Sequence, residues 1–218
     1  MIEIKFYSEK TGKYYKLVNT STWPYLEISG IKMHRADEID PKKDAMLKIK
    51  ALGRIYGRIL DCCTGLGYTA IIATSKRNVE EVITIEIDEN VIEIAKKNSF
   101  SKPLFENPKI KIIIGDAFQE IRNFEDEYFN FIIHDPPRIS IAHELYSLEF
   151  YKQLFRVLRK NGRMFHYVGR PGMKQGKNYI KGIVNRLRLA GFSRIKMIDY
   201  ALGLIAEKIY FRTDNPTI

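Results

Sequence analysis

One segment constrains the fold of this chain more than any other: residues 60–67, Leu-Asp-Cys-Cys-Thr-Gly-Leu-Gly. It follows a short strand pattern at residues 58–60 and precedes a helical pattern at residues 68–75. A strand, a glycine turn and a helix in this order form the context in which paired glycines indicate a nucleotide site. Gly65 permits the tight turn, and Gly67 lets a ligand approach the backbone. The segment predicts an α/β fold with a nucleotide-binding loop.

Acidic residues at strand ends define the rest of the expected site. Glu86 ends the apolar strand 82–85, nineteen residues after Gly67, where dinucleotide-binding folds place an acceptor for ribose hydroxyls. Four successive predicted strands end in an acid in this way: Asp61, Glu86, Asp116 and Asp135. Because ligands of open α/β sheets bind at the carboxyl ends of the strands, we expect these four side chains to line one crevice.

The loop residues themselves leave two ligand classes open. Ala70 interrupts the pattern Gly-x-Gly-x-x-Gly, but dinucleotide-binding proteins tolerate alanine there, so NAD or FAD is not excluded. Asp61 favours a second class. A carboxylate at the front of the loop repels a pyrophosphate and suits a ligand that carries an amine or a sulfonium.

With these motifs in this order, residues 45–212 resemble the class I S-adenosylmethionine-dependent methyltransferases. The resemblance implies a Rossmann-like α/β fold, with a mostly parallel sheet of seven strands whose last strand is antiparallel. It implies S-adenosyl-L-methionine as the cofactor, with its methionine part at the glycine loop, its ribose at Glu86 and its adenine at Asp116. The implied cofactor-binding residues are Asp61, Thr64, Gly65, Gly67, Glu86, Ile87, Asp116 and Ala117.

The segment Asp135-Pro136-Pro137-Arg138 resembles the Asn/Asp-Pro-Pro-aromatic motif of amino-methylating members. The resemblance implies a catalytic role for Asp135, Pro136 and Pro137: the acid and the Pro136 carbonyl accept the hydrogens of the target amine, and both prolines fix φ. Arg138 replaces the aromatic residue that stacks on the target base, although a guanidinium also stacks on bases. Further substrate contacts are expected from His34, Arg35, Tyr167 and Arg170.

The distribution of charge points to a polyanionic partner. The chain has 36 Lys and Arg against 26 Asp and Glu, a net charge of +10. Residues 151–198 hold 13 of these cations, no acid and several aromatic residues. Nucleic acid is the simplest partner for such a segment. Together with the amino-methylation motif, this predicts N-methylation of a base amine in tRNA or rRNA, with the oligomeric state left open.

The length of 218 residues fits one domain with a small extension. We expect a β extension at residues 1–40, with a hairpin turn at residues 10–13, and the methyltransferase domain at residues 41–218. Without a long apolar run or a leader pattern, the protein is expected to be cytoplasmic, away from membranes. Two adjacent cysteines and four scattered histidines lack the spacing of a metal site, so no metal is expected.

Hydrophobic periodicity and turn residues predict the remaining elements. They are helices at residues 42–55, 147–160 and 177–190, a loop at residues 99–107, a strand at residues 163–168, and closing strands at residues 194–200 and 204–211.

Two other functions compete with RNA methylation. A polyamine aminopropyltransferase using decarboxylated S-adenosylmethionine is one, because the layout of the chain is similar to that of spermidine synthases, including Gly115-Asp116-Ala117. Against it, that family's Asp-Ser-x-Asp-Pro stretch is replaced here by residues 135–138, and a net charge of +10 repels a polycationic acceptor. The other is an RNA-binding module with a relic cofactor pocket, which the four intact acids disfavour. DNA and the amide side chain of a basic ribosomal protein stay open as acceptors.

Overall fold

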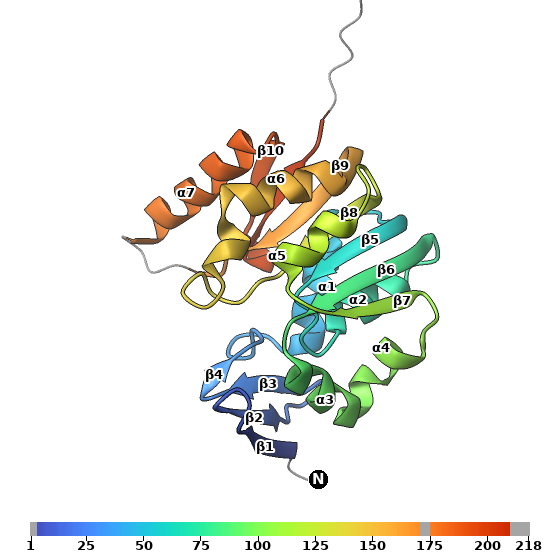
Figure 1. Ribbon diagram of the computed structural model, residues 1–218, viewed down its shortest axis with the longest axis vertical. Coiled ribbons are helices and arrows are strands. Elements are labelled where there is room, and N and C mark those ends of the chain that lie inside the picture. The colour runs from blue at the N-terminus through green and yellow to red at the C-terminus, as the bar shows by residue number, and fades with distance from the viewer. Residues whose placement is uncertain (1–3, 171–174, 210–218) are drawn as a thin grey trace, which may run out of the picture.

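The computed structural model describes residues 4–170 and 175–209. It has a sheet of seven strands with helices on both faces and, at the N-terminal end, a separate sheet of four strands (Figure 1).

The small sheet is an antiparallel meander, which confirms the predicted β extension. The turn between its first two strands is closed by a hydrogen bond from the Gly12 amide to the Ser8 carbonyl at 2.9 Å. Tyr15, Leu17 and Leu26 are buried in the same hydrophobic core as residues of the large sheet. The strands are β1 (Ile4–Ser8), β2 (Lys13–Val18), β3 (Tyr25–Ile28) and β4 (Ile31–Lys32).

The large sheet has the predicted Rossmann-like arrangement. Its order is β10-β11-β9-β8-β5-β6-β7, and all neighbours pair in parallel except β11, which is antiparallel to both β9 and β10. The prediction of a mostly parallel sheet with an antiparallel last strand is therefore confirmed. The strands are β5 (Gly57–Cys62), β6 (Val79–Glu86), β7 (Ile110–Ile114), β8 (Phe129–His134), β9 (Leu158–Tyr167), β10 (Ser193–Ile198) and β11 (Gly203–Glu207).

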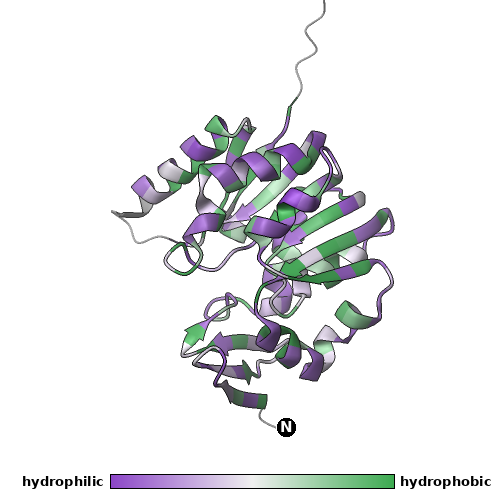
Figure 2. Ribbon diagram, viewed as in Figure 1, coloured by the Kyte–Doolittle hydropathy of each residue, from purple (hydrophilic) through white to green (hydrophobic). Residues whose placement is uncertain are grey.

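Helices cover both faces of this sheet and bury one hydrophobic cluster on each. One face carries α1 (Pro41–Leu52), α2 (Tyr68–Thr74), α3 (Glu89–Lys97) and α4 (Lys102–Glu106). The other carries α5 (Ala117–Glu120), α6 (Leu148–Val157) and α7 (Gln175–Leu189). Apolar residues run along the central strands, whereas the helices alternate polar and apolar stretches (Figure 2). No helix within the described residues combines the length and hydropathy needed to cross a bilayer.

Four short 3₁₀ helices complete the described elements: Ser99–Ser101, Ile121–Asn123, His143–Tyr146 and Asp199–Ala201.

Several predicted boundaries were wrong. The helix predicted at residues 147–160 ends at Val157, because Leu158 is already extended and begins β9. Residues 99–107 are not a loop but a 3₁₀ turn followed by α4, in which Pro103 stands in the first turn, where its missing N–H is harmless. The last strand ends at Glu207, and residues 210–211 of the predicted strand lie outside the described residues.

The sheet order explains why the acids form one site. Strands β8, β5, β6 and β7 are adjacent, so their carboxyl ends lie in a row along one edge of the sheet. Asp61 is the penultimate residue of β5, Glu86 ends β6, and Asp116 and Asp135 follow β7 and β8 closely.

Candidate active site

The glycine loop is held by Glu86. Gly65 and Gly67 have φ of 54° and 75°, the left-handed region that favours glycine. The Gly65 amide donates to Glu86 Oε2 at 2.9 Å, and the Asp88 amide donates to Oε1 at 3.1 Å. Burial raises the pKa of Glu86 to about 7, although these two amides act in the opposite direction. Glu86 thus links the loop after β5 to the start of α3.

Asp61 lies beneath the loop. It is fully buried and accepts hydrogen bonds from the hydroxyls of Thr69, at 3.0 and 3.1 Å, and of Thr84, at 3.1 Å. Burial raises its pKa to about 7, against the lowering effect of the threonines. The Thr64 hydroxyl bonds that of Thr84 at 2.7 Å. In this conformation Asp61 and Thr64 support the loop from inside, and their predicted contact with the methionine part stays a prediction.

The adenosine side of the predicted site combines carboxylates with exposed apolar surface. Ile87, directly after Glu86, is 68% exposed, and Ile114, at the end of β7, is 53% exposed. Asp116 caps α5 by accepting the Phe118 amide at 2.9 Å, and Ala117 is buried behind it. An isoleucine exposed between two carboxylates suits a ligand with an apolar ring and hydroxyl groups, so these residues fit an adenosine moiety.

A buried cluster of charges surrounds Asp135. Lys48 Nζ on α1 lies 2.5 Å from Asp135 Oδ2 and 2.8 Å from Asp44 Oδ2. The Arg35 guanidinium lies 3.7 Å from Asp44, and the Tyr167 ring centre lies 4.6 Å from Lys48 Nζ. We call these five residues the Lys48 cluster.

The pKa values in the Lys48 cluster follow from burial and pairing. Burial alone would lower the pKa of Lys48, but Asp135 and Asp44 raise it far above its ordinary value. Burial raises the pKa of Asp135, and the Lys48 ammonium opposes that rise. The ammonium therefore favours an ionised Asp135, which accepts hydrogen bonds and does not donate them.

The two prolines after Asp135 have different surroundings. The Pro137 carbonyl accepts the Tyr146 hydroxyl at 2.8 Å. No described residue donates to the Pro136 carbonyl. The Arg138 carbonyl accepts the amides of Ile141 and Ala142, while its side chain is exposed. The atom predicted to accept the target amine thus has no donor among the described residues, and the Arg138 side chain faces solvent.

The segment after the small sheet covers the glycine loop. His34 accepts the Leu26 amide at Nδ1, at 3.3 Å, and its Cε1 lies 4.0 Å from where a Cβ on Gly65 would stand. Burial, with a smaller contribution from Lys48, lowers the pKa of His34 to about 3, so this ring is neutral. Arg170 is exposed and pairs with Glu38, whereas the adjacent Pro171-Gly172 lie outside the described residues.

His134 is fully buried, and its ring packs against those of Tyr146 and Phe150. Its Nε2 pairs with the Leu145 carbonyl at 3.0 Å, and its ring lies 4.4 Å from that of His166.

Lys48 and Asp44 were missed by the sequence analysis. Lys48 lies on the face of α1 formed by Ala45, Ile49 and Leu52, all of them buried. A lysine on an otherwise apolar helix face is a recognisable signal, since a buried ammonium requires a partner.

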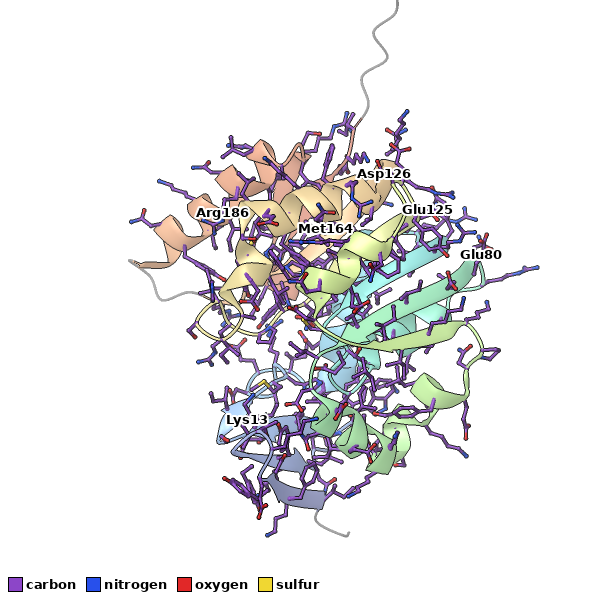
Figure 3. The ribbon with its side chains drawn as sticks, in the orientation of Figure 1. Lys13, Glu80, Glu125, Asp126, Met164 and Arg186 are labelled. Atoms are coloured by element: carbon purple, nitrogen blue, oxygen red, sulfur yellow. The ribbon has the colours of Figure 1, made fainter. Side chains whose placement is uncertain are left out.

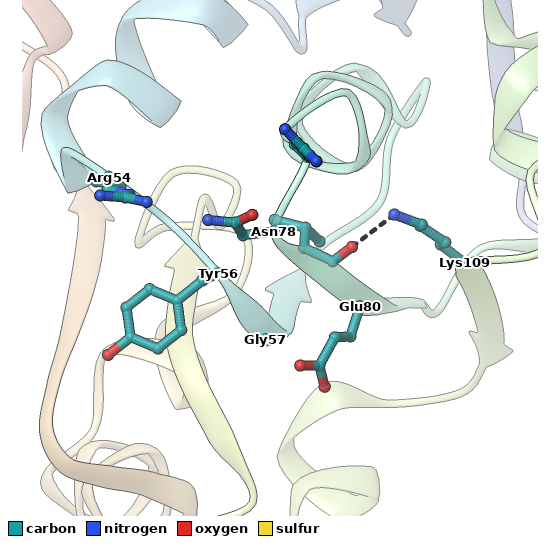
Figure 4. Close-up of a pocket in the computed structure, with 8 residues that line it drawn as sticks. Arg54, Tyr56, Gly57, Asn78, Glu80 and Lys109 are labelled. Atoms are coloured by element: carbon teal, nitrogen blue, oxygen red, sulfur yellow. Dashed lines mark hydrogen bonds between the residues drawn. The ribbon is translucent and has the colours of Figure 1, made fainter.

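A cavity in the described part of the chain lies elsewhere. It measures about 860 Å³ and is lined by Arg54, Tyr56, Arg77 and Lys109 among others, at the amino ends of β5 and β6 (Figure 4). It is at the opposite edge of the sheet from the four acids and holds none of the predicted site residues.

Comparison with known proteins finds relatives among polyamine-forming enzymes. The model of the spermine/spermidine synthase domain matches residues 68–203. An uncharacterised protein of Methanocaldococcus jannaschii is 53% identical over 197 residues, which cover 89% of this chain and 67% of that protein. The polyamine aminopropyltransferase of the same organism is 30% identical over 139 residues, 63% of this chain and 47% of the enzyme. The chain therefore spans less than half the length of that curated enzyme.

Solved structures agree on the fold. A spermidine synthase in complex with a transition-state analogue has a TM-score of 0.75 at 19% identity and covers 94% of this chain and 73% of its own. A putative S-adenosylmethionine-dependent methyltransferase of Methanococcus maripaludis has a TM-score of 0.57 at 20% identity and covers 79% of this chain and 86% of its own. These likenesses show the Rossmann-like fold alone. The comparisons thus agree better with the aminopropyltransferase hypothesis than with RNA methylation. They support a methyltransferase only at the level of the fold.

Proposed function

The chain belongs to the spermine/spermidine synthase family, and we propose that it transfers an alkyl group from an adenosyl sulfonium cofactor to an amine nitrogen. Glu86, Ile87 and Asp116 would hold the adenosine part, beside the glycine loop at Gly65. When bound, this cofactor supplies the electrophilic carbon next to its sulfonium sulfur.

One observation supports a neutral amine as the acceptor: the charges in the Lys48 cluster balance. Asp44 and Asp135 carry two negative charges, and Lys48 and Arg35 carry two positive ones. A polyamine acceptor needs a pocket with excess negative charge, whereas the exocyclic amine of a base is neutral. We therefore favour methyl transfer to a base amine within this family fold.

The residues around Asp135 suit such an amine. The nitrogen lone pair of an exocyclic amine is delocalised into the ring, and acceptors on its hydrogens shift it towards tetrahedral geometry. Asp135 and the Pro136 carbonyl, which no described residue bonds, are the two acceptors, and Asp135 takes up the proton that the nitrogen loses. Holding the amine in line with the electrophilic carbon contributes about 7–11 kcal/mol to barrier reduction in well-oriented reactions.

RNA as the carrier of the base rests on the basic segment 151–198, of which only part is free to bind. The Arg156 guanidinium donates to the Ile121 and Phe124 carbonyls and pairs with Asp126. Arg186, labelled in Figure 3, lies on α7. Its guanidinium donates to the Tyr146 carbonyl. Exposed cations such as Lys181 and Arg188 on α7 remain for phosphate contacts.

Aminopropyl transfer to a polyamine is the second candidate, and the family match supports it. The family model matches residues 68–203, which include Glu86, Asp116 and Asp135. In this reaction Asp135 would take a proton from the attacking amine, so the same residue serves both candidates.

Transfer of label distinguishes the two. The protein is incubated with methyl-labelled S-adenosylmethionine and bulk tRNA or rRNA and, in parallel, with labelled decarboxylated cofactor and putrescine or spermidine. Label that enters RNA and is released by nuclease supports methyl transfer. Label that enters only the polyamines would instead establish the second candidate, and Asp135→Asn should abolish either signal.

A further inference from the structure

The Lys48 cluster has the composition of a binding site for an alkylammonium ion. Two carboxylate oxygens, from Asp44 and Asp135, lie 2.8 and 2.5 Å from Lys48 Nζ, and the ring of Tyr167 lies 4.6 Å from it. Carboxylates with an aromatic face are the groups that recognise organic cations. The position is already filled, by the side chain of the protein itself.

We propose that Lys48 determines acceptor specificity: its ammonium takes the place beside Asp135 that a cationic amine would occupy, and so restricts the pocket to neutral amines. The inference rests on the proposed function in one respect, namely that the acceptor binds at Asp135.

Because the Lys48 cluster is buried, it can hold one ammonium group at a time, that of Lys48 or that of a ligand. The Lys48 side chain is 7% exposed and that of Asp44 3%, whereas that of Asp135 is 22% exposed. Asp135 thus faces Lys48 with Oδ2 and retains access to solvent. A second cation that approached it would meet the Lys48 charge at short range in a poorly solvated pocket, where like charges repel strongly.

The test removes the Lys48 ammonium and measures whether the pocket then binds a cationic ligand. Lys48→Met keeps a long unbranched side chain but leaves Asp44 and Asp135 without a cation between them. We expect spermidine, measured by calorimetry, to bind this variant about tenfold or more tightly than the parent protein. Lys48→Arg retains the charge and should show no gain. Lys43→Met, an exposed change on the same helix, alters net charge equally and should show none either.

Without the ammonium, Asp135 loses its cation and Asp44 keeps only Arg35, which could unfold the variant, so a second measurement accompanies the first. Lys48→Ala, which leaves space for a small cation, is refolded with and without ethylammonium, and its melting temperature is followed. Ethylammonium should raise the melting temperature of Lys48→Ala and leave that of the parent protein unchanged.

The outcomes separate this inference from the proposed function. Spermidine that binds the parent protein as tightly as Lys48→Met, or a folded Lys48→Met without any gain, overturns the role of Lys48. Failure of ethylammonium to stabilise Lys48→Ala overturns it as well. None of these measurements uses turnover, so an absence of label in RNA would refute methyl transfer and leave the gain of cation binding intact.

Discussion

The ionisation of Glu86 should make adenosine binding depend on pH. Ribose hydroxyls are donors, and a carboxylate accepts two of them better than a protonated acid does. In the free protein burial raises the pKa of Glu86 to about 7. The ligand therefore selects the ionised form, and affinity should fall as the pH drops through that value.

The size of the effect follows from the fraction that is ionised. At pH 6, one unit below the pKa, about one tenth of the free protein carries the carboxylate, so the dissociation constant rises about tenfold. At pH 7 the dissociation constant is about twofold higher than for the fully ionised protein, and above pH 8 the difference vanishes.

5′-Methylthioadenosine is the suitable probe, because it has the adenosine part and no group that titrates in this range. Calorimetry from pH 5.5 to 8.5 gives the dissociation constant as a function of pH, and we expect it to change about 30-fold over this range. Glu86→Gln should bind more weakly, by about 1.5–3 kcal/mol, with a flat profile. Asp61→Asn should leave the pH dependence of binding unchanged, since Asp61 is enclosed by Thr69 and Thr84. A flat profile for the parent protein would refute the assignment of Glu86 to the ribose.

Three further outcomes are expected. Asp135→Asn should lower kcat about 10²- to 10⁴-fold and leave 5′-methylthioadenosine binding unchanged; equal losses in both would contradict a role at the acceptor. Gly67→Ala should destabilise by about 1–3 kcal/mol in urea unfolding, because its Cβ would meet Leu104 Cδ2 at 2.6 Å. It should cost more than Gly65→Ala, whose Cβ would have His34 Cε1 at 4.0 Å as its nearest neighbour. Lys208→Met should lower the melting temperature by about 6–12 °C, because the buried ammonium donates to three backbone carbonyls at 2.7–3.4 Å; an unchanged melting temperature would argue against these contacts.

The sheet and its row of acids could be predicted because both depend on local signals. Apolar runs that end in Asp or Glu specify strands and their carboxyl ends, and parallel order then brings those ends to one edge. The glycine turn adds the position of the loop. None of this requires knowledge of which helix packs where.

The Lys48 cluster could not be derived in this way. Lys48 and Asp135 are 87 residues apart, and their contact exists only because α1 packs beside the end of β8. Charge counting overstated the number of cations free to bind a partner, for a similar reason. Arg156 and Arg186 belong to the basic segment, yet they donate to backbone carbonyls inside the fold. The end of α6 at Val157 was missed because Leu158 continues the apolar pattern of the helix while its backbone is extended.

A competition assay tests the neutral-acceptor pocket most directly. The protein is given S-adenosylmethionine and its decarboxylated form in equal amounts, together with bulk RNA and spermidine, and the nucleoside products are separated by chromatography. S-Adenosylhomocysteine as the main product, lost in Asp135→Asn, is the predicted result. 5′-Methylthioadenosine as the main product, formed only when spermidine is present, would contradict it and establish aminopropyl transfer.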